Sequence, residues 1–149
     1  MQSLDLDVLI DAQRWLAEGH RVSLLTVIDT FGSAPRPVGS MLAIRGDGRI
    51  SGSVSGGCVE DDLILRATRG EPLQHPQRLT YGVTKDEATR FGLPCGGTLE
   101  LVAEPLLDAS WISELLTRCG EHQLVARNLD LQSGKVALSA AERSDELMF

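Results

Sequence analysis

Cys58 is the residue whose neighbours most favour reactive chemistry. It lies in Ser55-Gly56-Gly57-Cys58, directly before a stretch that reads as the start of a helix. The first amides of a helix have no intrahelical partner, and glycines let a ligand approach the backbone closely. Such a turn can hold an anion, and the same amides stabilise a thiolate, which lowers the pKa of a cysteine placed there. The sequence therefore predicts a nucleophile, a sulfur carrier or a soft-metal ligand.

The residues that follow Cys58 work against this interpretation. Glu60, Asp61 and Asp62 suit a helix N-terminus, but their charge opposes a thiolate or an anionic ligand. In the alternative interpretation, the glycines form only a tight turn between a strand and a helix, and Cys58 is a small packed residue. The pattern alone leaves both interpretations open.

Two further segments could complete a site. Cys95 lies in FGLPCGG, where glycines again adjoin a thiol, and Arg36 lies in GSAPRPVG, where prolines stiffen the chain. A guanidinium binds a phosphate or a carboxylate in a bidentate way, so Arg36 is the best cationic candidate. The alternatives are a demanding loop with an incidental cysteine and an exposed surface arginine. Sequence alone does not reveal a disulfide between Cys58 and Cys95, because pairing needs geometry.

The remaining cysteine and the histidines point elsewhere. Cys119 continues a stripe of Ile112, Leu115 and Leu116 at helical spacing, which predicts a core position. The three histidines do not have the spacing of zinc ligands, and the chain has no glycine-rich nucleotide fingerprint or serine-nucleophile motif.

Periodicity predicts the elements that must position these residues. We expect a helix over residues 4–16, a buried strand over 21–30, and two short strands joined at 46–48. A helix should follow over 59–69, then strands near 77–83 and 98–103, a helix over 110–119, and two last strands over 122–130 and 135–139. Hairpins outnumber parallel crossovers, so the predicted fold is a single α+β domain with a mostly antiparallel sheet and about three packed helices.

Composition narrows the class of protein. The chain of 149 residues has 42% hydrophobic residues and a formal charge of −7, which argue for one globular domain and against general binding of nucleic acids or anionic membranes. Three cysteines without framework spacing favour a reducing, cytoplasmic setting. The first residues lack the basic flank and unbroken apolar core of a signal peptide, and no apolar run approaches about 20 residues, so we expect neither a signal peptide nor a membrane-spanning helix.

Taken together, three segments resemble a known family. The stretch GSAPRPVGSMLAIRGDGRISGSVSGGCVEDDL, followed by FGLPCGGTLELVAEPL, is similar to the N-terminal domain of the XdhC/CoxI family, over roughly residues 21–106. Members of this family are accessory proteins of xanthine dehydrogenase and related molybdenum hydroxylases. The combination of segments is specific, whereas any single segment would not be.

The resemblance implies a chaperone for molybdenum cofactor. Such a protein would bind the molybdopterin-type cofactor, protect it while its terminal sulfur is installed, and pass it to the apo-enzyme without turnover of its own. The resemblance assigns cofactor binding to Arg36, Gly56, Gly57, Cys58, Cys95, Gly96 and Gly97. It also makes Cys58 and Cys95 candidate ligands of the molybdenum.

The resemblance also sets expectations for domains and partners. Longer family members carry a C-terminal Rossmann-type domain, and no such motif follows here, so we expect residues 1–149 to be the N-terminal domain alone, without NAD binding. The expected partner is an apo-molybdenum hydroxylase, with a cysteine desulfurase and a second copy of the chain as further candidates. Two other functions stay open, namely a thiol-dependent sulfur transferase or redox protein using Cys58, and a scaffold that binds no cofactor.

Overall fold

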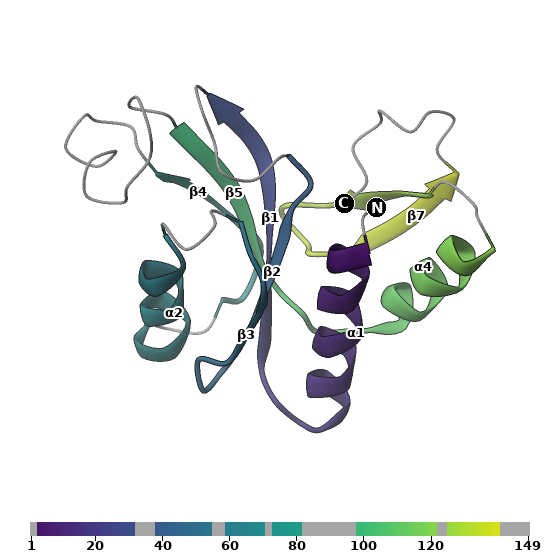
Figure 1. Cartoon of the computed structure of the whole chain (residues 1–149), viewed down its shortest axis with the longest axis horizontal. Helices are drawn as coiled ribbons and strands as arrows, with labels where there is room; N and C mark the ends of the chain where they lie inside the picture. The colour runs from purple at the N-terminus through teal and green to yellow at the C-terminus, as the bar shows by residue number, and fades with distance from the viewer. Residues whose placement is uncertain are drawn as a thin grey trace.

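The computed structural model describes residues 3–31, 38–54, 59–70, 73–81, 98–121 and 125–140. Three helices and seven strands lie in these ranges (Figure 1). In chain order they are α1 (Ser3–Ala17), β1 (Val22–Phe31), β2 (Met41–Arg45), β3 (Ile50–Gly52), α2 (Glu60–Arg69), β4 (Gln77–Tyr81), β5 (Thr98–Pro105), α4 (Ser110–Gly120), β6 (Val125–Leu129) and β7 (Val136–Ala140).

The strands form one five-stranded sheet and one hairpin. The order in the large sheet is β3-β2-β1-β5-β4, and every neighbouring pair is antiparallel. Strands β6 and β7 pair with each other as a separate two-stranded sheet. The predicted α+β fold with a mostly antiparallel sheet and three helices is therefore confirmed.

Both faces of the large sheet are covered. Strand β1 alternates in the usual way of strands, so that Leu24 packs into a cluster with α1 and α4, while Leu25 packs into a second cluster with α2. Figure 1 shows this layering, with α2 on one side of the sheet and α1, α4 and the β6–β7 hairpin on the other. A sheet buried on both faces explains why residues 22–27 read as an almost continuous apolar run.

Two turns contain glycines with a positive φ. Helix α1 ends at Ala17, and Gly19 adopts a φ of 90° as His20 N–H donates to the carbonyl of Trp15 at 3.0 Å. The β2–β3 turn places Gly48 at a φ of 97°, which a glycine adopts without steric cost. Arg45 and Asp47 form an ion pair of 2.6 Å in this turn. Strands β2 and β3 pair antiparallel on either side of it, so the predicted hairpin is confirmed.

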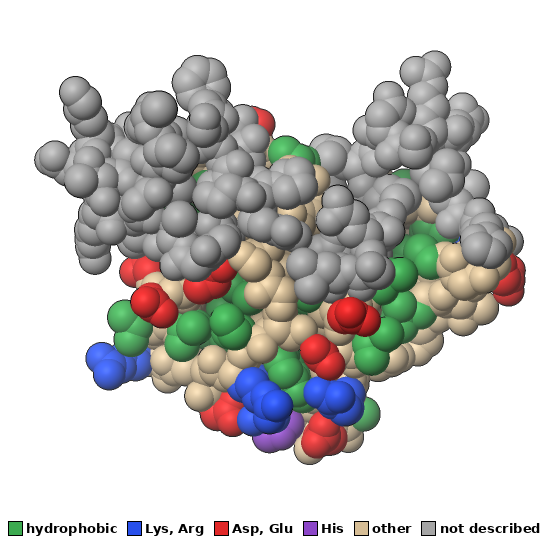
Figure 2. Space-filling view, in the orientation of Figure 1, with side chains coloured by type: hydrophobic (Ala, Val, Ile, Leu, Met, Phe, Trp, Pro, Cys, Tyr) green, Lys and Arg blue, Asp and Glu red, His purple; other side chains and the backbone are tan. Residues whose placement is uncertain are grey.

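The surface carries charges of both signs. Figure 2 shows basic and acidic side chains intermixed along the lower margin of the molecule, without a continuous basic surface among the coloured residues of this face. None of the helices in the described ranges is long and apolar enough to cross a membrane.

Candidate functional site

All three segments that carry the predicted site residues attach to the same edge of the large sheet. Strands β1, β3 and β4 run parallel to one another and end at this edge, where the antiparallel strands β2 and β5 begin. The strand register shows that these ends coincide, because Thr98, the first residue of β5, pairs with Phe31, the last residue of β1. Leu99 then pairs with Tyr81, the last residue of β4. We call this the motif edge of the sheet.

The predicted site residues themselves lie outside the described residues. These are Arg36, Gly56, Gly57, Cys58, Cys95, Gly96 and Gly97. Their positions in the chain nevertheless relate them to elements that are described. In the sequence, residues 32–37 follow β1 and precede β2, residues 55–58 lie between β3 and α2, and residues 82–97 lie between β4 and β5.

The chain on either side of residues 55–58 is firmly anchored. Val54 and Val59 are both fully buried, and both belong to the cluster beneath α2. Val59 is also the N-cap residue of α2, and its apolar side chain makes no capping hydrogen bond. Cys58 therefore directly precedes the start of a helix, as its sequence context predicted.

Two of the three acidic residues in the first turn of α2, Glu60 and Asp62, contact other side chains. The hydroxyl of Ser53 donates to Oε2 of Glu60 at 2.9 Å, and only 6% of Glu60 is exposed. Asp62 forms an ion pair with Nε of Arg66, one turn further along the helix, at 2.9 Å. Arg66 compensates the charge of Asp62, which weakens the electrostatic objection raised by the sequence.

Tyr81 joins β4 to this first turn. Its hydroxyl donates to Oδ2 of Asp62 at 2.6 Å, and the guanidinium of Arg66 lies 5.8 Å from the centre of the Tyr81 ring. Burial raises the pKa of Tyr81 well above its ordinary value, and the hydrogen bond to Asp62 raises it further. Tyr81 therefore stays a hydrogen-bond donor at physiological pH. Tyr81 directly precedes the segment 82–97, and Asp62 lies four residues after Cys58. The Tyr81–Asp62 hydrogen bond therefore joins described residues that lie near the ends of the two cysteine segments.

A cavity of about 300 Å³, lined by both charged and apolar side chains, lies between the large sheet and the β6–β7 hairpin. Its lining includes Thr26, Glu100 and Arg127, on β1, β5 and β6. The Arg127 guanidinium contacts Glu104 at 2.7 and 3.1 Å, and both side chains are almost fully buried. Within the described ranges, Oγ1 of Thr26 and Nε of Arg127 are buried and find no hydrogen-bond partner. Buried polar groups of this kind are commonly satisfied by water or a ligand.

Cys119 belongs to the hydrophobic packing of α4 and not to the predicted site. It is half-buried and packs against the cluster formed by α1 and α4, as the helical stripe predicted. Among the described residues, no three His, Cys, Asp or Glu side chains group together as a metal site would require.

Sequence reasoning missed the side chains that organise this region. Tyr81 and Asp62 are separated by 19 positions, and Glu104 and Arg127 by 23. One signal was available, because Tyr81 is the single tyrosine of the chain and directly precedes a polar segment. A buried tyrosine usually has a hydrogen-bond partner for its hydroxyl, and the acidic residues at the start of the preceding helix were candidate acceptors.

Comparison with known proteins supports the family resemblance. Residues 15–82 match the model of the XdhC and CoxI family. The molybdenum cofactor insertion chaperone PaoD of Escherichia coli is 32% identical over 127 residues, which are 79% of this chain and 37% of PaoD. A protein of Bacillus subtilis described as a probable xanthine dehydrogenase subunit is 28% identical over 101 residues, covering 66% of this chain and 29% of that protein.

A solved structure shares the fold. The crystal structure of a xanthine dehydrogenase from Bacillus halodurans superimposes with a TM-score of 0.66 at 26% identity, covering 93% of this chain and 43% of that one. This chain thus spans less than half the length of each of these relatives.

Proposed function

We propose that this chain, which belongs to the XdhC and CoxI family, binds molybdenum cofactor and delivers it to an apo-molybdenum hydroxylase. One observation carries the proposal: the three segments with the predicted binding residues attach to the same edge of the sheet. The relative named as a molybdenum cofactor insertion chaperone supports the choice of ligand.

The residue types of the three segments suit this ligand. Arg36 is assigned to the cofactor's phosphate, because a guanidinium binds phosphate in a bidentate way. The backbone amides next to Gly56, Gly57, Gly96 and Gly97 are assigned to its anionic groups. Cys58 and Cys95 are assigned to the molybdenum or its terminal sulfur, since thiolates are soft ligands. The bound cofactor supplies the redox and oxygen-transfer chemistry, which takes place only in the recipient enzyme.

The same assignment extends to sulfuration. We propose that the chain holds the cofactor while its terminal sulfur is installed, with a cysteine desulfurase as the sulfur source. In this role Cys58 and Cys95 shield the metal from water and bulk thiols, and no turnover by the chain itself is needed. Support for this role comes from the described residues nearest the two cysteines, because Val59 is buried and Thr98 is paired in β5 at the motif edge.

The convergence of the two cysteines can be tested without any cofactor. In a Cys119→Ala variant, a short bifunctional thiol reagent should join Cys58 to Cys95 within one chain, detected by mass spectrometry of the digested protein. The matched control is a Cys95→Ala variant, in which the same reagent should not join Cys58 to Cys119. Cross-linking that is equally fast in both variants, or absent from both, would contradict a shared site.

Cofactor binding is then measured directly. Purified molybdenum cofactor, titrated anaerobically into the wild-type chain, should bind with one-to-one stoichiometry, and Cys58→Ala, Cys95→Ala and Arg36→Gln should each weaken binding by about tenfold or more. Cys119→Ala should leave the affinity unchanged. No binding by the wild-type chain would favour a scaffold, whereas rapid alkylation of Cys58 together with sulfur transfer to an acceptor thiol would favour an enzyme.

A further inference from the structure

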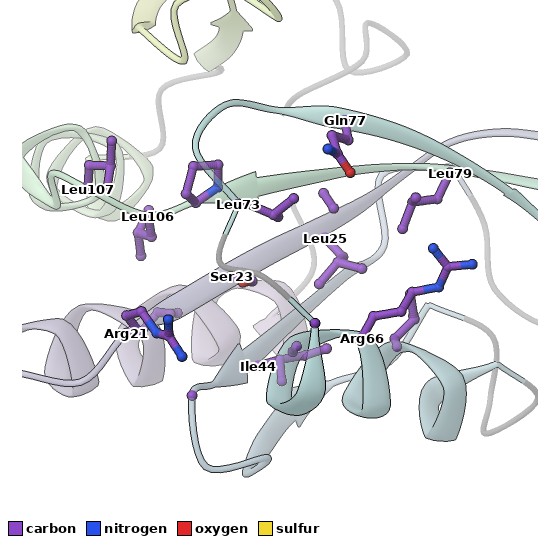
Figure 3. A pocket seen from close by; sticks show the side chains of 17 residues that line it. Arg21, Ser23, Leu25, Ile44, Arg66, Leu73, Gln77, Leu79, Leu106 and Leu107 are labelled. Atoms are coloured by element: carbon purple, nitrogen blue, oxygen red, sulfur yellow. The ribbon is translucent and has the colours of Figure 1, made fainter.

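A second cavity lies at the opposite edge of the large sheet, between the sheet and α2 (Figure 3). Its volume is about 300 Å³. The strand residues that border it come from the first part of β1 and β4 and the last part of β2 and β5, whereas the motif edge is formed by the other ends of these strands. The cavity is therefore distinct from the proposed cofactor site.

The walls of this cavity are largely apolar. The aliphatic side chains come from four strands of the sheet, from α2 and from the segment after it, and include Leu25, Ile44, Leu63, Leu73, Leu79 and Ala103. Leu107, which is 78% exposed, also borders the cavity. Leu25, Ile44 and Leu63 are themselves buried, whereas Leu73 and Leu79 are only half-buried. Part of the apolar wall therefore stays accessible to a ligand.

The charge of the cavity is opposite to that of the chain. Two arginines line it, Arg21 and Arg66, and none of its described lining residues is acidic, although the chain as a whole carries a formal charge of −7. Figure 3 shows Leu25 and Ile44 between the two arginines. A cationic group beside an apolar cavity favours a ligand that combines an anionic group with an apolar body.

The two arginines are not equivalent. Arg66 is already paired with Asp62 at 2.9 Å, whereas the guanidinium of Arg21 has no ion pair or hydrogen bond with the rest of the described chain. The C-terminal end of α2 also borders the cavity through Gly70, and the carbonyl groups at a helix C-terminus disfavour an anion. Arg21 is therefore the position for the anionic group.

We propose that this cavity binds a small amphiphilic carboxylate, with its apolar body against the leucines and its carboxylate at Arg21. The volume lies at the low end of the range for small-molecule sites, roughly 300–1,000 Å³, so a short aliphatic or single-ring acid fits better than a long-chain lipid. This proposal is independent of the cofactor assignment, because it uses none of the residues assigned to the cofactor.

Octanoate and its neutral counterpart octanol are suitable probes, titrated into the full chain by calorimetry and followed by backbone amide NMR. Octanoate should bind about tenfold more tightly than octanol, with shifts confined to residues around Leu25, Ala67 and Leu79. Arg21→Gln should reduce the octanoate affinity to that of octanol. Arg69→Gln is the matched control, since Arg69 lies in the last turn of α2 but does not line the cavity.

A filling variant tests the apolar part of the site. Ala67 lines the cavity from α2, and Ala67→Phe should place a ring inside it and abolish binding of both probes while leaving the far-ultraviolet circular dichroism unchanged. Equal affinities for octanoate and octanol, unaffected by Arg21→Gln, would overturn the role of charge. No binding of either probe, or protection of these residues by self-association at high protein concentration, would overturn the ligand site itself.

Discussion

The hydroxyl of Tyr81 lies 2.6 Å from Oδ2 of Asp62 and joins the last residue of β4 to the first turn of α2. Asp62 also pairs with Arg66, and the Arg66 guanidinium lies against the Tyr81 ring, so the three side chains form one cluster. Tyr81 is 2% exposed, while the side chain of Asp62 is 25% exposed. The cluster fixes the position of α2 relative to the sheet at the end where residues 55–58 and 82–97 begin or end.

Removing the tyrosine hydroxyl should destabilise the fold measurably. We expect Tyr81→Phe to lower the free energy of unfolding by about 1–2 kcal/mol, because it removes a hydrogen bond to a carboxylate that is partly shielded from water. Urea denaturation followed by tryptophan fluorescence provides the measurement. In a double-mutant cycle with Asp62→Asn, the coupling energy should be about 1 kcal/mol. Strictly additive effects would show that the two side chains do not interact in solution.

The pKa of Tyr81 reports on the same hydrogen bond to Asp62. Tyr81 is the single tyrosine, so tyrosinate absorbance reports it alone. Burial and the hydrogen bond to Asp62 raise its pKa above the ordinary value of 10.0. The stabilising contribution is thus complete below pH 10 and is lost as the pH rises through the higher pKa of the folded state. Asp62→Asn should lower this pKa toward the ordinary value; an unchanged titration curve would place Asp62 away from the phenol.

Gly52 is the glycine where a side chain should cost most. It ends β3 at a φ of 90°, and a Cβ there would collide with the carbonyl oxygen of Met41 and with Val8 of α1. Because the strained φ and the backbone collision act together, Gly52→Ala should lower the free energy of unfolding by about 2–4 kcal/mol. Gly120→Ala is the control, since a Cβ at Gly120 meets no described atom within 4 Å, and it should be neutral or slightly stabilising. Equal unfolding midpoints for the two variants would contradict the close approach of β3 to α1.

Local patterns were enough to predict the elements themselves. The apolar run that became β1, the Gly-Asp-Gly turn between β2 and β3, and the stripe that places Cys119 against the core are encoded by neighbours in the sequence. In each case the deciding interaction spans only a few residues, so periodicity and turn chemistry capture it.

The arrangement of the elements could not be read in the same way. Strand β5 lies between β1 and β4, and its antiparallel pairing with both brings Tyr81 and Thr98 to the edge where β1 ends. The Tyr81–Asp62 and Glu104–Arg127 pairs depend on which face each strand presents, which no local pattern specifies. The roles of Cys58, Cys95 and Arg36 stay predictions, now with a shared point of attachment for their segments.

The buried ion pair between Glu104 and Arg127 fastens the β6–β7 hairpin to the large sheet. Both side chains are at most 3% exposed, and the Arg127 guanidinium lies 4.5 Å from the centre of the Trp111 ring. Glu104→Gln leaves a buried guanidinium without its counter-charge, so we expect a loss of about 3–5 kcal/mol in the free energy of unfolding. The surface pair of Glu114 and Arg118 serves as the control, and Glu114→Gln should cost less than about 0.5 kcal/mol.

A double replacement separates the destabilisation caused by breaking the ion pair from the stability that the intact pair contributes. Glu104→Leu combined with Arg127→Met removes both charges and keeps similar volumes, so its stability should return to within about 1 kcal/mol of wild type or exceed it. Chemical denaturation of the single and double variants under one set of conditions provides the comparison. If the double variant were as unstable as Glu104→Gln, the pair would have to contribute net stabilisation beyond charge compensation, through its packing on Trp111 or through polar groups in the adjoining cavity.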